Sequence, residues 1–290
     1  MKIAVFGTNI SDEYKSKAEE VIHSFIANGF DVSIYKDFKS ALDSASFSIG
    51  NLPEFTEIKE NSFNILLSLG GDGTFLKCAH LCYATNTPIL GINFGKLGFL
   101  AQTNPDDIDF IIKDIQNKKF SIRQRTVLDF SYATDKEILN GIGLNEITLQ
   151  KSNTVKLIKI NVYVGKEFLC SFWADGVAVS TPTGSTGYSL SLGAPILAPE
   201  NHSLIITPIA PHTLSMRPII IPDTETSTIE ATGEYTDFLL SNDFLSQTIQ
   251  ANPSVVIKKS PHTISTVEFK DSSFFCTLRQ KLKLGIDIRK

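Results

Sequence analysis

A glycine-rich turn with a single carboxylate, GGDG at residues 70–73, is the clearest candidate for chemistry in this sequence. It follows a strand-like run, Asn64–Leu69, and precedes a helix that we expect to begin at Thr74. Glycines let a ligand approach the backbone, and free N–H groups at a helix start attract anions such as phosphate. Asp72 nevertheless places a negative charge in the turn, so this residue needs an explanation of its own.

Neither common nucleotide-binding pattern is present around this turn. A dinucleotide-binding turn has the pattern G-x-G-x-x-G, which Gly70, Gly71 and Gly73 do not provide. The nearby GINFGKL, residues 91–97, is too short for a phosphate-binding P-loop and lacks the hydroxyl residue after its lysine.

Phosphoryl transfer would explain the carboxylate of Asp72. Phosphates bind to backbone N–H groups, whereas the acceptor hydroxyl must be oriented and must finally lose a proton, a task for which other kinases use a fixed aspartate. A carboxylate is a weak base near neutral pH, so orientation would be most of its work. The alternative is an ordinary turn in which Asp72 caps the helix.

A second candidate, DGVAVSTPTGSTGYSLS at residues 175–191, is rich in hydroxyl groups. From Ser180 to Ser191 it has seven Ser or Thr and one Tyr in twelve positions, and no charge. Neutral donors and acceptors suit the hydroxyls, amide and base edges of a nucleotide. A solvated Ser/Thr loop is the alternative, and a nucleophilic serine is disfavoured because G-x-S-x-G is absent.

The third candidate is GIGLNEITL, in which Asn145 and Glu146 lie within an apolar, strand-like run. A charge in such a position needs a partner. That partner is either a pair of vicinal ribose hydroxyls or a lysine in a structural ion pair, and the residues alone leave both possibilities open.

Composition indicates a globular enzyme of about two domains. The chain has 290 residues, of which 42% are apolar, and a net charge of −4, which gives no electrostatic indication of a nucleic-acid or membrane partner. No signal-peptide core is evident, so we expect a cytoplasmic protein.

Cys78 and Cys82 flank His80, but no second ligand pair accompanies them, so reduced, packed thiols are favoured over a metal site.

The elements that must position these residues change in type near residue 120. Before it, strands expected at Lys2–Phe6, Phe30–Tyr35, the run ILLSL and Pro88–Ile92 alternate with helices, one from a Ser11 cap to Gly29 and one from Asn104 to Asn117. The segment from Asp37 to Ser62 is ambiguous. After Phe120, short alternating runs predict strands. We therefore predict an α/β domain at 1–119 with a parallel sheet, a mostly β domain at 120–268, and a C-terminal segment, 269–290, that packs back on the first domain.

Taken together, these motifs resemble those of the NAD kinase family. The resemblance extends from about residue 64 to FFCTLRQKL at 274–282 and includes GGDGT at 70–74, GINFGKLGFL at 91–100, NEITL at 145–149, the run at 175–191 and PHTLSMRP at 211–218. GGDGT alone is weak, because lipid kinases and phosphofructokinases have similar turns, but its combination with TPTGSTGY is specific. The resemblance implies an α/β fold with a Rossmann-like N-terminal domain and a β-rich C-terminal domain.

The implied activity is transfer of the terminal phosphoryl group of ATP to the 2′-hydroxyl of the adenosine ribose of NAD, which yields NADP. By matched positions, Asp72 would be the catalytic carboxylate. The resemblance implies substrate contacts for Gly71, Gly73 and Lys77 near the phosphates, for Asn145 and Glu146 at the adenosine ribose with Lys156 close by, for Asp175 at the other nucleoside, and for Thr183, Thr186, Gly187, Tyr188 and Ser191 along the dinucleotide pocket. Mg²⁺ or another divalent metal would enter with ATP, bound mainly by its phosphates, and the protein would be a homo-oligomer, a dimer or tetramer.

Several positions depart from the family pattern. Gly187 replaces a usual alanine, which should leave room for the ligand; SNDF at 241–244 replaces a turn that commonly reads Asp-Gly-Gln; and Leu284 replaces a frequent tryptophan. His212 and Arg217 look functional, but we expect a buried histidine and an arginine paired with backbone or carboxylate instead.

The alternatives to an NAD kinase are a lipid kinase of the diacylglycerol or sphingosine type and a non-catalytic NAD(H)-binding regulator.

Overall fold

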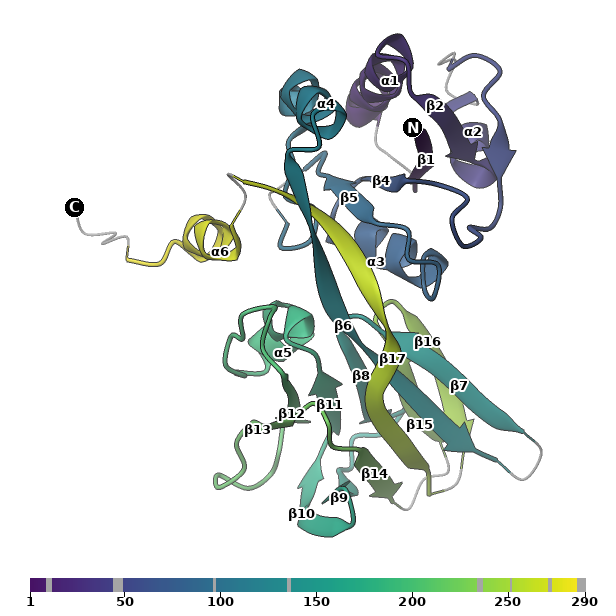
Figure 1. Ribbon diagram of the computed structural model, residues 1–290. Coiled ribbons are helices and arrows are strands. Elements are labelled where there is room, and N and C mark those ends of the chain that lie inside the picture. Colours follow the sequence, from purple (N-terminus) through teal and green to yellow (C-terminus); the bar gives the residue numbers. More distant parts are fainter. Residues whose placement is uncertain are drawn as a thin grey trace. The chain divides into compact units, whose positions relative to one another are not determined.

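Two long strands, β6 (Phe120–Ala133) and β17 (Ser254–Phe269), connect the two compact units of the chain (Figure 1). The computed structural model describes residues 1–8, 12–43, 49–95, 98–134, 137–233, 237–250, 252–270 and 273–285. The first unit comprises Met1–Gln124 and Ile264–Lys290, and the second comprises Arg125–Thr263. The boundary expected at residue 120 lies at the start of β6, whereas the contacts divide that strand after Gln124.

The first unit is built on a parallel sheet, as the alternation of strands and helices predicts. Its order is β5–β4–β1–β2–β3, and β17 adds beside β5 where Thr266 pairs with Ile89. The strands are β1 (Lys2–Gly7), β2 (Asp31–Tyr35), β3 (Glu54–Phe55), β4 (Ile65–Leu69) and β5 (Ile89–Ile92). Every residue of β4 and β5 is buried, which is typical of parallel strands covered on both faces.

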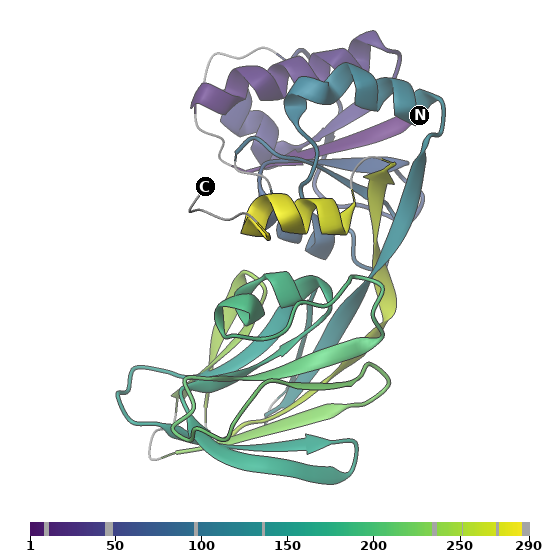
Figure 2. The ribbon, with the colours of Figure 1, turned by 90° about the vertical axis from the view of Figure 1, so that its left-hand side faces the viewer.

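Helices cover both faces of this sheet. The helices of this unit are α1 (Asp12–Ala27), α2 (Lys36–Asp43), α3 (Asp72–Leu81), the 3-10 turn η1 (Pro105–Asp107), α4 (Ile108–Gln116) and α6 (Phe274–Leu282). Helices α1 and α4 lie side by side on one face, where their apolar residues form a core with β1, β2 and β4 (Figure 2). The buried residues of α3 lie outside that core, on the other face (Figure 1). Gly29 follows α1 with a φ of 79°, as expected for a helix-ending glycine, whereas the expected Ser11 cap lies outside the described residues.

Two antiparallel sheets pack face to face in the second unit. One has the order β10–β9–β14–β17, with β6 and β7 beyond β17, and the other has the order β13–β12–β11–β8–β15–β16. The strands not yet given are β7 (Ile138–Gly143), β8 (Glu146–Lys151), β9 (Ile158–Val164), β10 (Glu167–Ala174), β11 (Gly176–Ser180), β12 (Ser203–Ile209), β13 (Ile219–Pro222), β14 (Ser227–Thr232), β15 (Asp237–Asn242) and β16 (Leu245–Gln250). Apolar side chains of both sheets, such as Phe130 and Phe238, form one core. The α/β fold class with a β-rich second part is confirmed.

The cysteines of α3 and its C-terminal end are packed thiols. Cys78 and Cys82 are free and buried, and burial raises the pKa of Cys82 to about 12, so its thiolate is disfavoured near neutral pH. No cluster of three or more possible metal ligands occurs in the described part of the chain. No helix within the same residues is long and apolar enough to cross a membrane.

Candidate active site

The GGDG turn connects the carboxyl end of β4 to the N-terminus of α3. Gly70 has a φ of 151°, and an added Cβ would overlap the hydroxyl oxygen of Thr74, so the fold itself requires glycine here. Gly71 and Gly73 differ, because a Cβ at either would meet no atom within 4 Å. The fold therefore does not explain glycine at these two positions, whereas a ligand that approaches the helix N-terminus would.

The carboxylate of Asp72 binds a row of backbone amides instead of its own helix. Its Oδ1 accepts hydrogen bonds from the N–H groups of Leu100 and Ala101, both at 3.0 Å, and its Oδ2 accepts one from Phe99 at 2.8 Å. The N-cap of α3 is Gly71, without a side-chain cap bond. The interpretation of Asp72 as a helix cap is therefore wrong. Three N–H donors fix the orientation of a charged group that lies at the open turn.

Two further residues that sequence reasoning missed surround Asp72. A Cβ at Gly98 would overlap Asp72 Oδ1, so glycine there lets the amide row approach the carboxylate. Lys281 of α6 lies with its Nζ 3.7 Å from Asp72 Oδ2 and 4.4 Å from the ring centroid of Phe99. The residues 98–101 belong to the motif GINFGKLGFL and its flank, but only the folded chain shows that their main chain faces Asp72. Lys77, the other expected phosphate residue, is exposed further along α3.

In the second unit, Asn145 and Glu146 occupy a turn between β7 and β8 that is bound from two sides. The hydroxyl of Thr181 donates to Leu144 O at 2.6 Å, and the N–H of Thr181 donates to Asn145 O at 2.9 Å. On the other side, the carboxylate of Asp243 accepts from the N–H groups of Leu144, Asn145 and Glu146 at 2.8, 2.8 and 3.3 Å. The backbone of the turn is thus fully engaged, which orients its two polar side chains.

Glu146 is a buried acid whose hydrogen bonding is incomplete within the described residues. Its exposed fraction is 9%, and its Oε2 is fully buried with no hydrogen-bond partner among these residues. Burial, together with the negative charge of Asp243, raises its pKa to about 8, while a hydrogen bond from the Tyr188 N–H acts in the opposite direction. No lysine in the described ranges forms an ion pair with it, so the structural ion pair finds no support there. Such a carboxyl group suits hydroxyl donors from a ligand.

The hydroxyl-rich segment is packed beside this acid and is not a solvated loop. It forms the 3-10 turn η2 (Thr183–Thr186) and the short helix α5 (Tyr188–Ser191). A Cβ at Gly184 would overlap Asn145 O, and a Cβ at Gly187 would lie 3.2 Å from both Asn145 Nδ2 and Glu146 Oε2. The structure thus brings Asn145, Glu146, Gly187 and Tyr188 together.

The hydroxyls of this segment fall into two groups. Those of Ser185 and Thr186 bind backbone carbonyls of the same turn, at 2.6 and 3.1 Å. That of Thr183 is buried and has no hydrogen-bond partner in the part of the chain that the structure describes. Tyr188 and Ser191 are exposed. Some hydroxyls therefore build the turn, whereas Tyr188 and Ser191 lie at the surface, where a ligand can reach them.

The chain matches family models over both of its units. The model of the ATP-NAD kinase N-terminal domain matches residues 4–120, and that of the ATP-NAD kinase C-terminal domain matches residues 144–269. The chain belongs to the ATP-NAD kinase family. It is 37% identical over 293 residues to the NAD kinase of Flavobacterium johnsoniae and 39% identical over 297 residues to that of Flavobacterium psychrophilum, and each match covers 100% of both chains.

Solved structures support the fold. The structure of yeast NADH kinase complexed with NADH has a TM-score of 0.88 at 24% identity and covers 100% of this chain and 89% of that one. An NAD kinase from Archaeoglobus fulgidus in complex with ATP has a TM-score of 0.72 at 23% identity, with 98% and 99% covered. Both likenesses show that the two-part fold described above is that of ATP-NAD kinases.

Two residues that the family resemblance assigned to the ligand lie away from Glu146. The register pairs Ser180 of β11 with Glu146 and Gly176 with Gln150, so Asp175, just before β11, lies about a strand length from Glu146. The Nζ of Lys151, a residue that sequence reasoning missed, is 2.5 Å from Asp175 Oδ1. Lys156 is exposed in the segment beyond the Lys151 end of β8. The structure therefore does not bring Lys156 beside Asn145 and Glu146, contrary to our expectation.

The segment PHTLSMRP contributes an exposed loop. Arg217 Nη1 donates to Leu214 O at 2.6 Å and to Met216 O at 2.7 Å, which confirms the expected pairing with backbone. His212 is exposed, so the expectation of a buried histidine is wrong. A buried histidine is the commoner outcome, but this loop lies outside both sheets.

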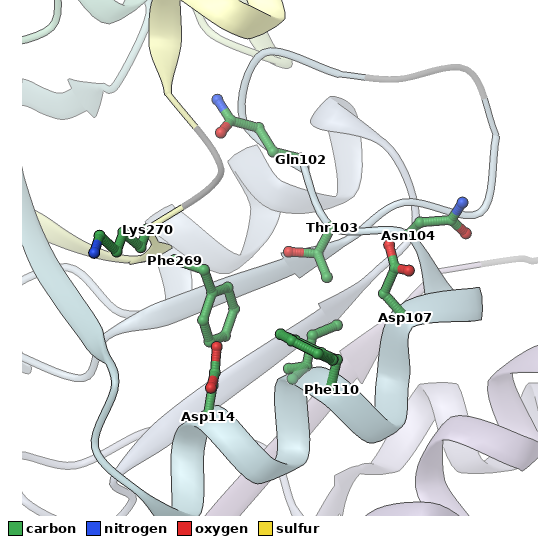
Figure 3. Close-up of a pocket in the computed structure, with 9 residues that line it drawn as sticks. Gln102, Thr103, Asn104, Asp107, Phe110, Asp114, Phe269 and Lys270 are labelled. Atoms are coloured by element: carbon green, nitrogen blue, oxygen red, sulfur yellow. The ribbon is translucent and has the colours of Figure 1, made fainter.

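A separate pocket of about 460 Å³ lies in the first unit and contains none of the expected site residues (Figure 3). Gln102, Thr103 and Asn104 line it from the segment that directly follows the amide row, and Phe269 and Lys270 line it from the end of β17. Asp107 precedes α4, and Phe110 and Asp114 lie on that helix. The pocket therefore belongs to the scaffold behind the amide row, and we do not assign it to the substrates.

Proposed function

We propose that this member of the ATP-NAD kinase family phosphorylates the 2′-hydroxyl of the adenosine ribose of NAD with ATP to give NADP. The observation that carries the proposal is the carboxylate of Asp72, which three N–H groups fix beside a helix N-terminus that is open at Gly71 and Gly73. Phosphoryl transfer needs these two features together, a place for phosphate and a fixed carboxylate for the acceptor.

The hydrogen bonds of Asp72 indicate which of its atoms acts. A carboxylate has about four acceptor sites, and here two N–H groups use Oδ1 while one uses Oδ2. The remaining site on Oδ2 would accept the 2′-hydroxyl. As the bond from O2′ to the terminal phosphorus forms, the bond from that phosphorus to its bridging oxygen breaks. ADP leaves with the electron pair, and the hydroxyl proton passes to Oδ2.

The phosphates of ATP are proposed to lie at the N-terminus of α3. The backbone at Gly71 and Gly73 is open there, and the positive end of the helix dipole favours anions. Lys77 is exposed on the same helix and would contribute positive charge near them. A methyl group on either glycine would occupy space that the phosphates need.

The adenosine ribose is proposed to bind Asn145 and Glu146. The buried Oε2 of Glu146 would accept hydrogen bonds from ribose hydroxyls, which would complete its hydrogen bonding. For the rest of the dinucleotide we propose contacts with Thr183, Thr186, Gly187, Tyr188 and Ser191. Asp175 would bind the other nucleoside. We also propose that Lys156 contacts the substrate, on the basis of its motif position alone.

Mg²⁺ fits the residues at the turn only as part of a complex with ATP. This ion usually keeps several waters and binds one or two carboxylates together with substrate phosphates. The described residues offer no cluster of three or more His, Cys, Asp or Glu side chains that could hold the ion, so the phosphates would supply most of its ligands. Bound to the phosphates, Mg²⁺ would neutralise part of their charge.

We also propose a homo-oligomer, a dimer or tetramer, and a place in the cytoplasm, both on the family resemblance and composition.

The test is a coupled assay with the purified full chain, NAD and Mg·ATP, in which an NADP-specific dehydrogenase reports product. We expect NADP to accumulate with the parent and to fall strongly with Asp72→Asn. The two alternatives have different outcomes. Phosphorylated diacylglycerol or sphingosine without NADP would indicate a lipid kinase, and NAD binding by calorimetry without ADP formation would indicate a regulator.

A further inference from the structure

The hairpin between β15 and β16 places an acid against the turn that carries Asn145 and Glu146. Asp243 lies in its two-residue turn with a φ of 52°, a left-handed conformation. Its own N–H donates to Glu146 O at 3.1 Å, while its carboxylate accepts the three N–H bonds of residues 144–146. Asp243 is therefore attached to this turn through four hydrogen bonds.

This attachment is more than an ordinary strand contact. Hydrogen bonds to a charged acceptor are about twice as strong as neutral ones, and three successive N–H groups converge on one carboxylate. Without the Asp243 carboxylate, three N–H groups of a largely buried turn would lose their acceptor. The direction of the Asn145 and Glu146 side chains depends on this backbone.

We propose that Asp243 is a positioning residue for NAD: it fixes the Asn145–Glu146 turn through its backbone hydrogen bonds and places a negative charge beside Glu146. The inference rests on the proposed role of Glu146 toward ribose hydroxyls. Asp243 itself touches no substrate in this scheme. It acts through the backbone bonds and through its field.

The surroundings of Glu146 make Asp243 the decisive charge among the described residues. From β11, the neighbour of Glu146 is the uncharged Ser180, and from the hydroxyl-rich segment the neighbours are Gly187 and the main-chain N–H of Tyr188. Only the β15–β16 hairpin adds a charged side chain that acts on Glu146 in this part of the chain.

Binding should therefore be linked to a proton. Below about pH 8, Glu146 is mostly protonated in the free protein, because burial and then Asp243 raise its pKa to about 8. An ionised carboxylate accepts two ribose hydroxyls, so NAD binding favours loss of that proton. The affinity for NAD should rise as pH rises toward 8, and binding at pH 7 should release up to about one proton.

The variants Asp243→Asn and Asp243→Gly test this. Both remove the charge, and both residue types adopt the left-handed φ. Asparagine keeps one side-chain oxygen that can accept N–H bonds, so it protects against failure of the glycine variant to fold. Asp237→Asn, at the start of β15, is the matched control for loss of one negative charge. For each protein, KM for NAD and for ATP is measured across pH 6 to 9. Calorimetry in buffers of different ionisation enthalpy counts the protons released when NAD binds at pH 7.

We expect both Asp243 variants to raise KM for NAD about tenfold or more, with little change for ATP. The pH at which NAD affinity changes should move to lower values, and fewer protons should be released at pH 7. Asp237→Asn should resemble the parent. An unchanged pH dependence, or equal increases in both KM values, would overturn the inference. The proton count needs only NAD binding, so it remains decisive if the parent makes no NADP, which would instead contradict the proposed function.

Discussion

The two carboxylates that the proposed reaction uses, Asp72 in the first unit and Glu146 in the second, are prepared for substrate in opposite ways. Asp72 accepts three backbone N–H bonds, and its side chain is 32% exposed. Glu146 is 9% exposed, has one oxygen without a partner among the described residues, and has a pKa raised to about 8. The charge of Asp72 is therefore stabilised before substrate binds. The hydrogen bonding of Glu146 is completed only when substrate binds.

This difference between Asp72 and Glu146 suits two different functions in an active site. A group that must orient a hydroxyl in the transition state benefits from a fixed geometry that needs no reorganisation. A group that selects a substrate benefits from an unmet hydrogen-bonding need, because an analogue without the matching hydroxyls leaves a buried polar atom unpaired. Asp72 should therefore govern kcat, and Glu146 should govern KM for NAD.

Replacement of Asp72 should have the largest effect. Asp72→Asn removes the proton acceptor, so we expect kcat to fall by about 10²- to 10⁴-fold. NAD binding, measured by calorimetry on the same folded variant, should barely change. The asparagine NH₂ group would face one of the three N–H donors, so a stability loss of about 1–3 kcal/mol is expected as well. A kcat within tenfold of the parent would show that the carboxylate only anchors residues 99–101.

The glycines of the turn sharpen the role of the first carboxylate. Gly73→Ala adds a methyl group that touches nothing in the protein, so the melting temperature should stay near that of the parent. Turnover should fall about a hundredfold through displacement of the phosphates. Gly70→Ala is the matched contrast, because it forces a strained φ and overlaps Thr74, and it should lower stability. Normal activity of a stable Gly73→Ala protein would contradict phosphate binding at this turn.

Sequence reasoning located both carboxylates but not what surrounds them. The glycine turn, the buried β4 and the apolar setting of Glu146 are local patterns, and each is found in the structure. The partners of Asp72 lie 27 to 29 residues away, and those of Asp243 lie 97 to 99 residues away. These contacts are made by main-chain N–H groups, which every residue except proline has, so side-chain identity gives no signal for them.

The same limit explains the errors. The motif position of Lys156 predicts a place near Glu146, but β8 carries the chain away from Glu146 before the segment with Lys156 begins. Lys151, Gly98 and Lys281 were missed because their importance depends on tertiary neighbours. The contacts divide β6 after Gln124 and β17 before Ile264, a few residues from the boundaries that the change of sequence pattern predicts, because a strand that runs through both units shows no local break.

Glu146→Gln tests the other side of the comparison. Glutamine cannot supply two acceptor oxygens, so we expect KM for NAD to rise about tenfold while KM for ATP changes little. Equal effects on both substrates would count against ribose binding. The matched control is Glu230→Gln on β14, which changes a charge outside the site.

The difference in stability between the parent and Glu146→Gln should depend on pH. Folding raises the pKa of Glu146 to about 8, above its unfolded value of about 4.3, so stability from this group is present below about pH 4 and is lost as pH rises through 8. Glutamine does not titrate. Glu146→Gln should therefore melt a few degrees above the parent at pH 8 and close to it at pH 4.5, as checked by thermal unfolding. Equal shifts at both pH values would contradict a raised pKa.

Replacement of Lys281 should have the smallest effect on kcat. The size of that effect shows whether the backbone N–H bonds alone hold Asp72 in place. Its Nζ lies 3.7 Å from Asp72 Oδ2, and both side chains are about one third exposed, so the pair is worth at most about 1 kcal/mol. Because the three N–H bonds already fix the carboxylate, Lys281→Ala should lower kcat about fivefold at most, and the difference should shrink as salt is added. Lys281→Arg should restore most of the activity, and Arg279→Ala on the same helix is the control. A loss as large as that of Asp72→Asn would mean that the amides do not suffice and that α6 completes the site.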